Sequence, residues 1–130
     1  MKTILLIEDN KDILENLTEY LEIEGYNILV ANNGKKGVQF AKEFLPDLIV
    51  CDVLMQGMDG HEVLRLLFDT LKTHKIPFIF STSLSEKIDR IESLKLGADD
   101  YIIKPFESEV LLKMAKVWIK STSNQNLAVL

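Results

Sequence analysis

The chain alternates short apolar runs with longer segments of helical period. The runs are TILLIE (Thr3–Glu8), NILVA (Asn27–Ala31), DLIVCD (Asp47–Asp52), PFIFST (Pro77–Thr82) and DYIIK (Asp100–Lys104). Each is short and almost continuously apolar, which is typical of parallel strands that are covered by helices on both faces. This alternation excludes an all-helical fold and favours an α/β domain.

Between and after these runs, apolar residues recur at the spacing of a helix face. The predicted faces are Ile13, Leu14, Leu17, Tyr20 and Leu21; Val38, Ala41, Phe44 and Leu45; Val63, Leu64, Leu67 and Leu71; Ile88, Ile91 and Leu94; and Val110, Leu111, Met114, Val117 and Trp118. Gly25 and Pro46 end the first two segments. Repeated strand–helix units predict a doubly wound, five-stranded parallel sheet in the flavodoxin-like order 2-1-3-4-5, with helices on both faces.

The length and composition indicate one domain with one sizeable core, since the chain has 130 residues and is 47% hydrophobic. No apolar run approaches the ~20 residues that span a bilayer, and no basic-then-apolar signal follows Met1, so we expect a cytoplasmic protein without membrane contact. The regular pattern covers residues 1–120. Residues 121–130 are polar at first, and we expect a tail or the start of a linker there.

Charge and the rare reactive residues exclude several kinds of site. A net charge of -5 and a pI near 5.0 argue against direct nucleic-acid binding by this domain. Cys51 is the only thiol, which excludes an intramolecular disulfide and a cysteine metal cage, and its apolar surroundings indicate a core residue. His61 and His74 fall at a helix start and near a helix end, and we assign neither a role.

Polar residues stand at the carboxyl ends of four of the predicted strands. They are Glu8 and Asp9, Asp52, Ser81 and Thr82, and Lys104. In an open α/β sheet, ligands bind outside these ends, at the switch point between the first and third strands. Crowded carboxylates are costly unless a cation lies among them, and an all-oxygen set suits Mg²⁺ better than Zn²⁺. The sequence therefore predicts an acidic Mg²⁺ site.

Each of these residues also has a plain structural interpretation. Asp9 or Asn10 would cap the first helix, Asp52 would be a turn acid, Thr82 would cap the fourth helix and Lys104 would be solvated. Capping alone would not place acids on the first and third strands together with a lysine on the fifth. We therefore favour a shared site.

Four stretches resemble the receiver domain of two-component response regulators. They are LLIEDN (Leu5–Asn10), Asp52 with MDG (Met58–Gly60) behind it, Thr82-Ser83, and GADDYIIKPF (Gly97–Phe106). The resemblance covers about residues 2 to 120. It implies a phosphorelay switch in which Asp52 accepts a phosphoryl group, in a Mg²⁺-dependent reaction, from a sensor histidine kinase or a phosphotransfer protein.

The same resemblance implies a role for each residue of the site. Glu8, Asp9, Asp52 and the backbone carbonyl of Leu54 would hold Mg²⁺. Thr82 would hydrogen-bond the phosphoryl group, and Lys104 would form an ion pair with it.

The resemblance also implies an output. Tyr101 would turn inward on activation, and the Lys104–Pro105 peptide would be cis. The surface of the fourth helix, fifth strand and fifth helix would change and signal onward, and a phosphorylation-dependent homodimer is one expected form of output. Such a protein is a switch that promotes its own phosphorylation and dephosphorylation, not an enzyme acting on an external substrate.

Some positions depart from the family pattern or adjust it. Gln56 replaces the usual proline, and Ser83 replaces the usual alanine. Leu54 and Leu84 would flank the path of the water that hydrolyses the aspartyl phosphate. Because neither side chain orients water, we expect a long-lived phosphorylated state.

Three other functions are alternatives to the switch. A phosphatase of the haloacid dehalogenase type would have Asp-x-Asp, but position 54 is Leu. A flavin-binding module would need a Ser/Thr/Gly-rich phosphate loop where this chain has the acidic EDNKD. A degenerate receiver that acts as an interaction module without phosphorylation is the alternative. The kinase, the output, and the choice between a stand-alone protein and the N-terminal part of a transcription factor stay open.

Overall fold

The computed structural model describes the backbone of residues 1–129 and the side chains of residues 1–120. Its elements are β1 (Thr3–Ile7), α1 (Lys11–Ile23), β2 (Asn27–Ala31), α2 (Gly34–Phe44), β3 (Leu48–Cys51), α3 (Gly60–Phe68), β4 (Phe78–Thr82), α4 (Lys87–Lys95), β5 (Asp100–Ile103) and α5 (Ser108–Val129). Each strand begins and ends within one residue of the apolar run that predicted it. The strand predictions are confirmed.

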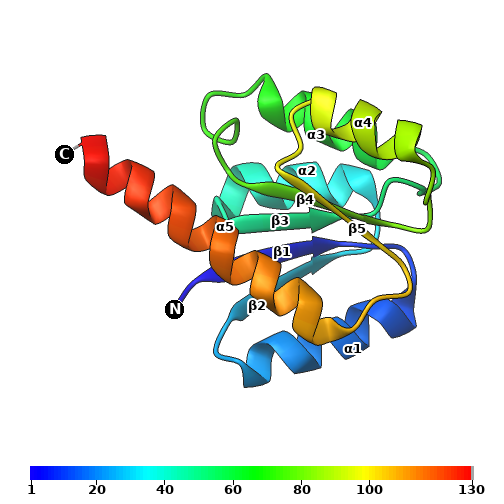
Figure 1. Ribbon diagram of the computed structural model, residues 1–130, viewed down its shortest axis with the longest axis horizontal. Helices are drawn as coiled ribbons and strands as arrows, with labels where there is room; N and C mark the ends of the chain where they lie inside the picture. Colours follow the sequence, from blue (N-terminus) through cyan, green and yellow to red (C-terminus); the bar gives the residue numbers. More distant parts are fainter. Residues whose placement is uncertain (130) are drawn as a thin grey trace.

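The strands form one parallel sheet in the order β2-β1-β3-β4-β5, as predicted. Helices α1 and α5 cover one face, and α2, α3 and α4 cover the other (Figure 1). The chain moves outward from β1 to β2 and then returns to the other side of β1 with β3. The carboxyl ends of β1 and β3 therefore lie side by side at the switch point.

The strands are continuously apolar because each contributes to two cores. In β1, Leu5 and Ile7 join the cluster under α2 and α3, whereas Ile4 and Leu6 join the cluster under α1 and α5. Successive side chains of a strand point to opposite faces, so a strand covered on both sides needs apolar residues at every position.

Two predicted helix faces extend too far. Helix α3 ends at Phe68, and Leu71 lies in the turn that follows, 88% exposed. The hydroxyl of Thr70 donates to the carbonyl of Leu66, 2.9 Å away, which helps to end the helix before the position of Leu71. In α2, Phe44 is the last helical residue, and Leu45 is the C-cap in the left-handed conformation, 47% exposed.

The prediction for α4 is wrong in its buried face. Ile88, Ile91 and Leu94 are 58%, 37% and 37% exposed. Among the residues of α4, all within the described part of the chain, only Ser93 is buried. Apolar spacing alone pointed to the wrong side of this helix.

The C-terminal helix is longer than the predicted domain. The backbone of α5 continues through residues 121–129, where a tail or linker was expected, and the side chains there lie outside the described residues. The boundary at residue 120 stays a prediction. None of the helices in the described chain has the length and apolar character needed to cross a membrane.

Candidate functional site

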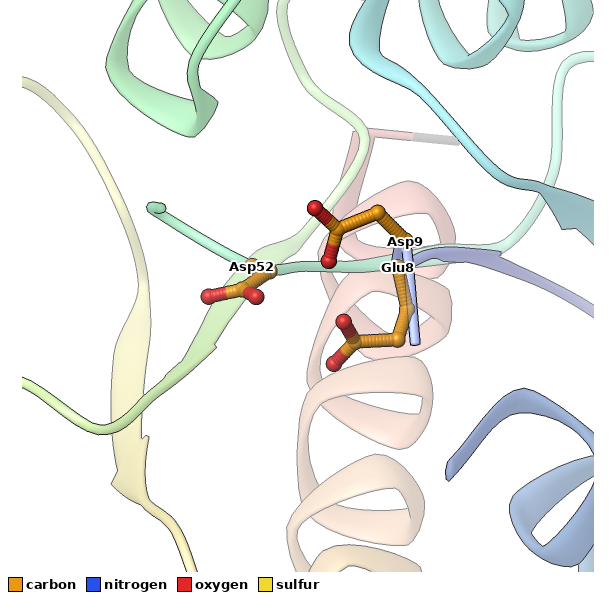
Figure 2. A group of neighbouring side chains, drawn as sticks. All are labelled: Glu8, Asp9 and Asp52. Carbon is orange, nitrogen blue, oxygen red and sulfur yellow. The ribbon is translucent and has the colours of Figure 1, made fainter. Parts of the chain in front are cut away.

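The pairing of β1 with β3 brings the first two acids together. Ile7 is in register with Cys51, and the amide of Asp52 donates to the carbonyl of Ile7, 3.0 Å away. Glu8 and Asp52, which directly follow the two strands, are therefore neighbours. Figure 2 shows the carboxyl groups of Glu8, Asp9 and Asp52 around one space. One oxygen from each of the three lies within 4.8 Å of the others.

Asp9 can point into the space between the three acids because Asn10, and not Asp9, caps helix α1. The side chain of Asn10 accepts from the amide of Ile13, 3.1 Å away, and is the N-cap of α1. Asp9 is exposed, whereas Glu8 and Asp52 are buried. The site thus has two buried acids at its base and one acid that solvent reaches.

Lys104 follows the edge strand β5, and its side chain reaches the acids at the ends of β1 and β3. Thr82 is in register with Ile103, so Lys104 follows at the carboxyl end of β5, and its amide donates to the carbonyl of Thr82, 2.8 Å away. Its Nζ donates to Glu8 Oε1 and to Asp52 Oδ2, the latter at 3.2 Å. With 16% of its side chain exposed, Lys104 is not a solvated lysine.

Burial and mutual charge set the protonation of this group. Burial raises the pKa of Glu8, against the opposing effect of its hydrogen bonds to Lys104 and to the amide of Asn10. Burial alone would lower the pKa of Lys104, but the bond to Glu8 and the charges of Asp52 and Glu8 outweigh it and raise that pKa. Lys104 is therefore cationic and offsets part of the negative charge gathered at Glu8 and Asp52.

The loop after Asp52 returns to the site at the start of α3. The amide of Leu54 donates to Asp52 Oδ1 at 3.2 Å, so the turn-acid interpretation of Asp52 holds alongside its place in the cluster. Gly60, the first residue of α3, approaches so closely that a Cβ there would lie 2.1 Å from the carbonyl oxygen of Asp52. Leu54 itself is 52% exposed.

Thr82 and Tyr101 form a buried pair beside the acids. Thr82 is fully buried, and its hydroxyl accepts from the amide of Leu84 at 3.3 Å. It does not cap α4, because the N-cap there is Glu86. The Tyr101 ring is buried, and its hydroxyl donates to the carbonyl of Leu84, 2.7 Å away. The Lys104–Pro105 peptide is cis.

The sequence gives no sign of a contact between His61 and Ser93, which is linked to Tyr101 through Phe80. His61 Nε2 and the hydroxyl of Ser93 lie 3.1 Å apart, and the His61 ring meets Phe80 edge to face with a centroid distance of 5.3 Å. Neither residue has a charge pattern or motif spacing that would mark it. Cys51, by contrast, is a core residue as predicted: it is fully buried, and burial raises the pKa of its thiol.

Comparison with known proteins assigns the family. The model of the response regulator receiver domain family matches residues 4–116. The chain belongs to the response regulator receiver domain family. This receiver domain is 37% identical over 112 residues to the transcriptional regulatory protein CpxR of Escherichia coli strain K12, a match that covers 86% of the chain and 47% of CpxR. The receiver domain thus spans about half the length of that relative.

Other relatives have the size of a receiver domain alone. Protein PilH of Pseudomonas aeruginosa is 35% identical over 113 residues, which is 87% of this chain and 93% of PilH. A crystal structure of the receiver domain of a Pseudomonas aeruginosa sensor histidine kinase, with a magnesium ion coordinated in its active site cleft, superposes with a TM-score of 0.85 at 28% identity. That match covers 92% of this chain and 98% of the other.

Proposed function

We propose that this receiver domain is a phosphorelay switch in which Asp52 accepts a phosphoryl group from a phosphohistidine of a sensor histidine kinase or phosphotransfer protein. The observation that carries the proposal is the position of the Asp52 carboxylate, which lies 3.2 Å from Lys104 Nζ and in one cluster with the carboxylates of Glu8 and Asp9. The chain would work in the cytoplasm, without direct nucleic-acid contact by this domain.

The three acids fit a divalent cation of the Mg²⁺ type. Their oxygens converge within 4.8 Å, and the exposed Asp9 leaves one side open to water, as Mg²⁺ prefers. Glu8, Asp9, Asp52 and the carbonyl of Leu54 would hold the ion. When bound, Mg²⁺ neutralises negative charge on the phosphoryl oxygens.

The residues of this chain suffice for the remaining chemistry. Phosphoryl transfer requires mainly in-line positioning and charge stabilisation. An Asp52 oxygen forms the new bond to phosphorus while the phosphorus–nitrogen bond of the donor breaks. The electron pair of the broken bond stays with the imidazole nitrogen of the donor histidine, which takes up a proton. Lys104, already bonded to Asp52, stabilises the negative charge on the transferred group. The chain is then a switch that promotes its own phosphorylation and dephosphorylation.

The phosphorylated Asp52 would offer acceptor oxygens to Thr82 and Lys104. The Thr82 hydroxyl now accepts from Leu84, and reorienting it toward the phosphoryl group would alter the segment that Tyr101 also contacts through the Leu84 carbonyl. Tyr101 is inward in this structure. Phosphorylation would therefore consolidate this arrangement and the surface of α4, β5 and α5.

A phosphorylation-dependent homodimer through this surface is the output we propose. Half-exposed apolar side chains are spread over it, namely Ile88, Ile91, Leu94, Ile103, Val110 and Val117. Its charged residues are partly engaged within one chain, since Lys113 pairs with Glu109 at 3.5 Å and Asp100 accepts from Trp118 Nε1 at 2.9 Å. Apolar contact would thus contribute more than reciprocal ion pairs. Sedimentation with and without beryllofluoride tests this, and a monomer in both states at high concentration contradicts it.

The lifetime of the phosphorylated state is set, in this proposal, by Leu54. Leu54 follows Asp52 by two residues, is 52% exposed, and has a side chain with no group to orient water. Leu84 packs partly against the core, so Leu54→Asn is a cleaner test than a change at Leu84. We expect faster loss of the phosphoryl group in Leu54→Asn after the donor is removed, with unchanged Mg²⁺ affinity. A decay no faster than in the parent would contradict this role.

Acetyl phosphate with Mg²⁺ provides the direct test of the site. The parent should gain one phosphoryl group by mass spectrometry and Asp52→Asn should gain none, while Asp12→Asn, on the exposed side of α1, should behave like the parent. Glu8→Gln with Asp9→Asn should weaken Mg²⁺ binding and keep the fold. A phosphorylated Asp52→Asn variant would place the acceptor elsewhere, and a parent that is never modified would favour the phosphorylation-independent alternative.

A further inference from the structure

A buried polar contact joins helix α4 to helix α3. Ser93 is 1% exposed and is the only buried residue among Lys87–Lys95, all of which the structure describes. Its hydroxyl lies 3.1 Å from His61 Nε2, near the start of α3. A buried hydroxyl needs a partner, because one left unpaired costs free energy. The contact with His61 therefore fixes where α4 sits.

His61 also contacts the aromatic residues that line the switch. Its ring meets Phe80 edge to face at 5.3 Å, and Phe80 meets Tyr101 in the same manner at 6.5 Å. Such pairs contribute beyond simple area burial. The His61 ring thus contacts Phe80, which packs against Tyr101, and it also contacts Ser93 of α4.

Helix α4 forms part of the surroundings of Tyr101. Burial raises the pKa of Tyr101 most, and the negative charge of Asp89, in the first turn of α4, raises it further. The hydroxyl of Tyr101 donates to Leu84 in the segment that leads into α4. A shift of α4 would therefore change the space that the tyrosine ring occupies.

We infer that His61 is a positioning residue for the switch: its hydrogen bond to Ser93 holds α4 against α3, keeps Tyr101 inward, and thereby strengthens binding of a phosphoryl group at Asp52. This inference rests on the proposed function. It assigns no step of phosphoryl transfer to His61. It predicts that the inward state is favoured before phosphorylation because the contact already exists.

The experiment compares Ser93→Ala and His61→Phe with a matched control. Ser93→Ala removes the hydroxyl with little change in volume, and His61→Phe keeps the ring on Phe80 but removes the hydrogen bond. Thr73→Val is the control. Thr73 is a buried residue in the segment after α3, and its hydroxyl donates to the carbonyl of Leu67, 2.6 Å away. The variant should lose stability without affecting the switch.

Binding of beryllofluoride with Mg²⁺ is one readout. We expect each of the two variants to weaken it about three- to tenfold, and the double variant to weaken it no more than either single change, because both remove the same bond. Thr73→Val should bind like the parent. Equal affinity in all variants, or additive losses in the double variant, would overturn the inference.

The second readout needs no phosphoryl analogue. In the ligand-free protein, Ser93→Ala and His61→Phe should speed amide exchange in α4 and shift the ring resonances of Tyr101, while Thr73→Val leaves both unchanged. Unchanged α4 exchange and Tyr101 resonances would overturn the inference. If the parent fails to bind beryllofluoride, the proposed function fails, and this second readout still decides whether His61 positions α4.

Discussion

Helices α3 and α4 have nine residues each and lie on the same face of the sheet, yet they are held to it in different ways (Figure 1). Helix α3 buries Gly60, Val63, Leu64 and Leu67. Helix α4 buries only Ser93 among its described residues. Helix α3 is fixed by several buried residues, whereas α4 combines partly exposed apolar residues with one buried, hydrogen-bonded serine, so we expect α4 to be the easier of the two to reposition.

The N-terminus of α3 is also better stabilised than the N-terminus of α4. The side chain of Asp59 caps α3 by accepting from the amide of Glu62 at 2.9 Å. The N-cap residue of α4 is Glu86, whose side chain makes no capping bond in the described structure. In the proposed switch, α3 would be the firm frame and α4 the movable element.

The largest expected effect comes from the buried leucine of α3. Leu67→Ala should lower the free energy of unfolding by about 2–5 kcal/mol, because it leaves a cavity at a site that is 2% exposed. Leu94→Ala in α4 should cost less than about 1 kcal/mol, since Leu94 is 37% exposed. Urea unfolding of both variants checks the contrast, and equal losses would mean that α4 is anchored as firmly as α3.

The capping contrast should be smaller. Asp59→Ala should cost about 1 kcal/mol by removing the bond to Glu62, whereas Glu86→Ala should change stability little. Glu86→Ser should instead stabilise α4, because the backbone of residue 86 is already extended as a cap requires. Amide exchange within each helix measures these effects. Slower exchange in α4 of Glu86→Ser would sharpen the comparison, and no change would argue that fraying at this end is unimportant.

The smallest effect concerns pH. Burial and the charge of Asp89 raise the pKa of Tyr101 above 10.0, so the unfolded chain loses this proton first as the pH rises. The folded state then binds more protons than the unfolded state, and stability falls between pH 10.0 and the raised pKa. Tyr101→Phe should show a shallower decline over that range in urea titrations. An identical slope would mean that the ring is not held in its buried position.

The sequence was informative wherever burial on two faces or strand order determined the outcome. Continuously apolar runs predicted the strands, and the strand order predicted that Glu8, Asp52 and Lys104 meet. These predictions needed only periodicity and the rule for strand ends.

The sequence was less informative where one long-range contact decides the outcome. The apolar spacing of Ile88, Ile91 and Leu94 indicated a packed face, but the buried residue of α4 is Ser93, which has a partner in another helix. A histidine thirty-two positions away cannot be recognised as that partner from local pattern. The exposure of Leu71 was missed because helical period continues past the residue at which the chain turns.

Gly60 shows how this geometry limits the residues that a position accepts. A Cβ there would meet the Asp52 carbonyl oxygen at 2.1 Å and the Val53 Cα at 2.8 Å, and both obstacles are backbone atoms that cannot turn aside. At Gly57 nothing lies within 4 Å, and only its φ of +74° favours glycine. Asparagine and aspartate tolerate that conformation better than other residues.

Saturation mutagenesis should therefore give different profiles at Gly57, in the loop, and at Gly60, the first residue of α3. Position 57 should retain function with asparagine or aspartate, whereas position 60 should accept glycine alone. The close contact between the start of α3 and the residues that follow β3 thus leaves no room for gradual sequence change at position 60.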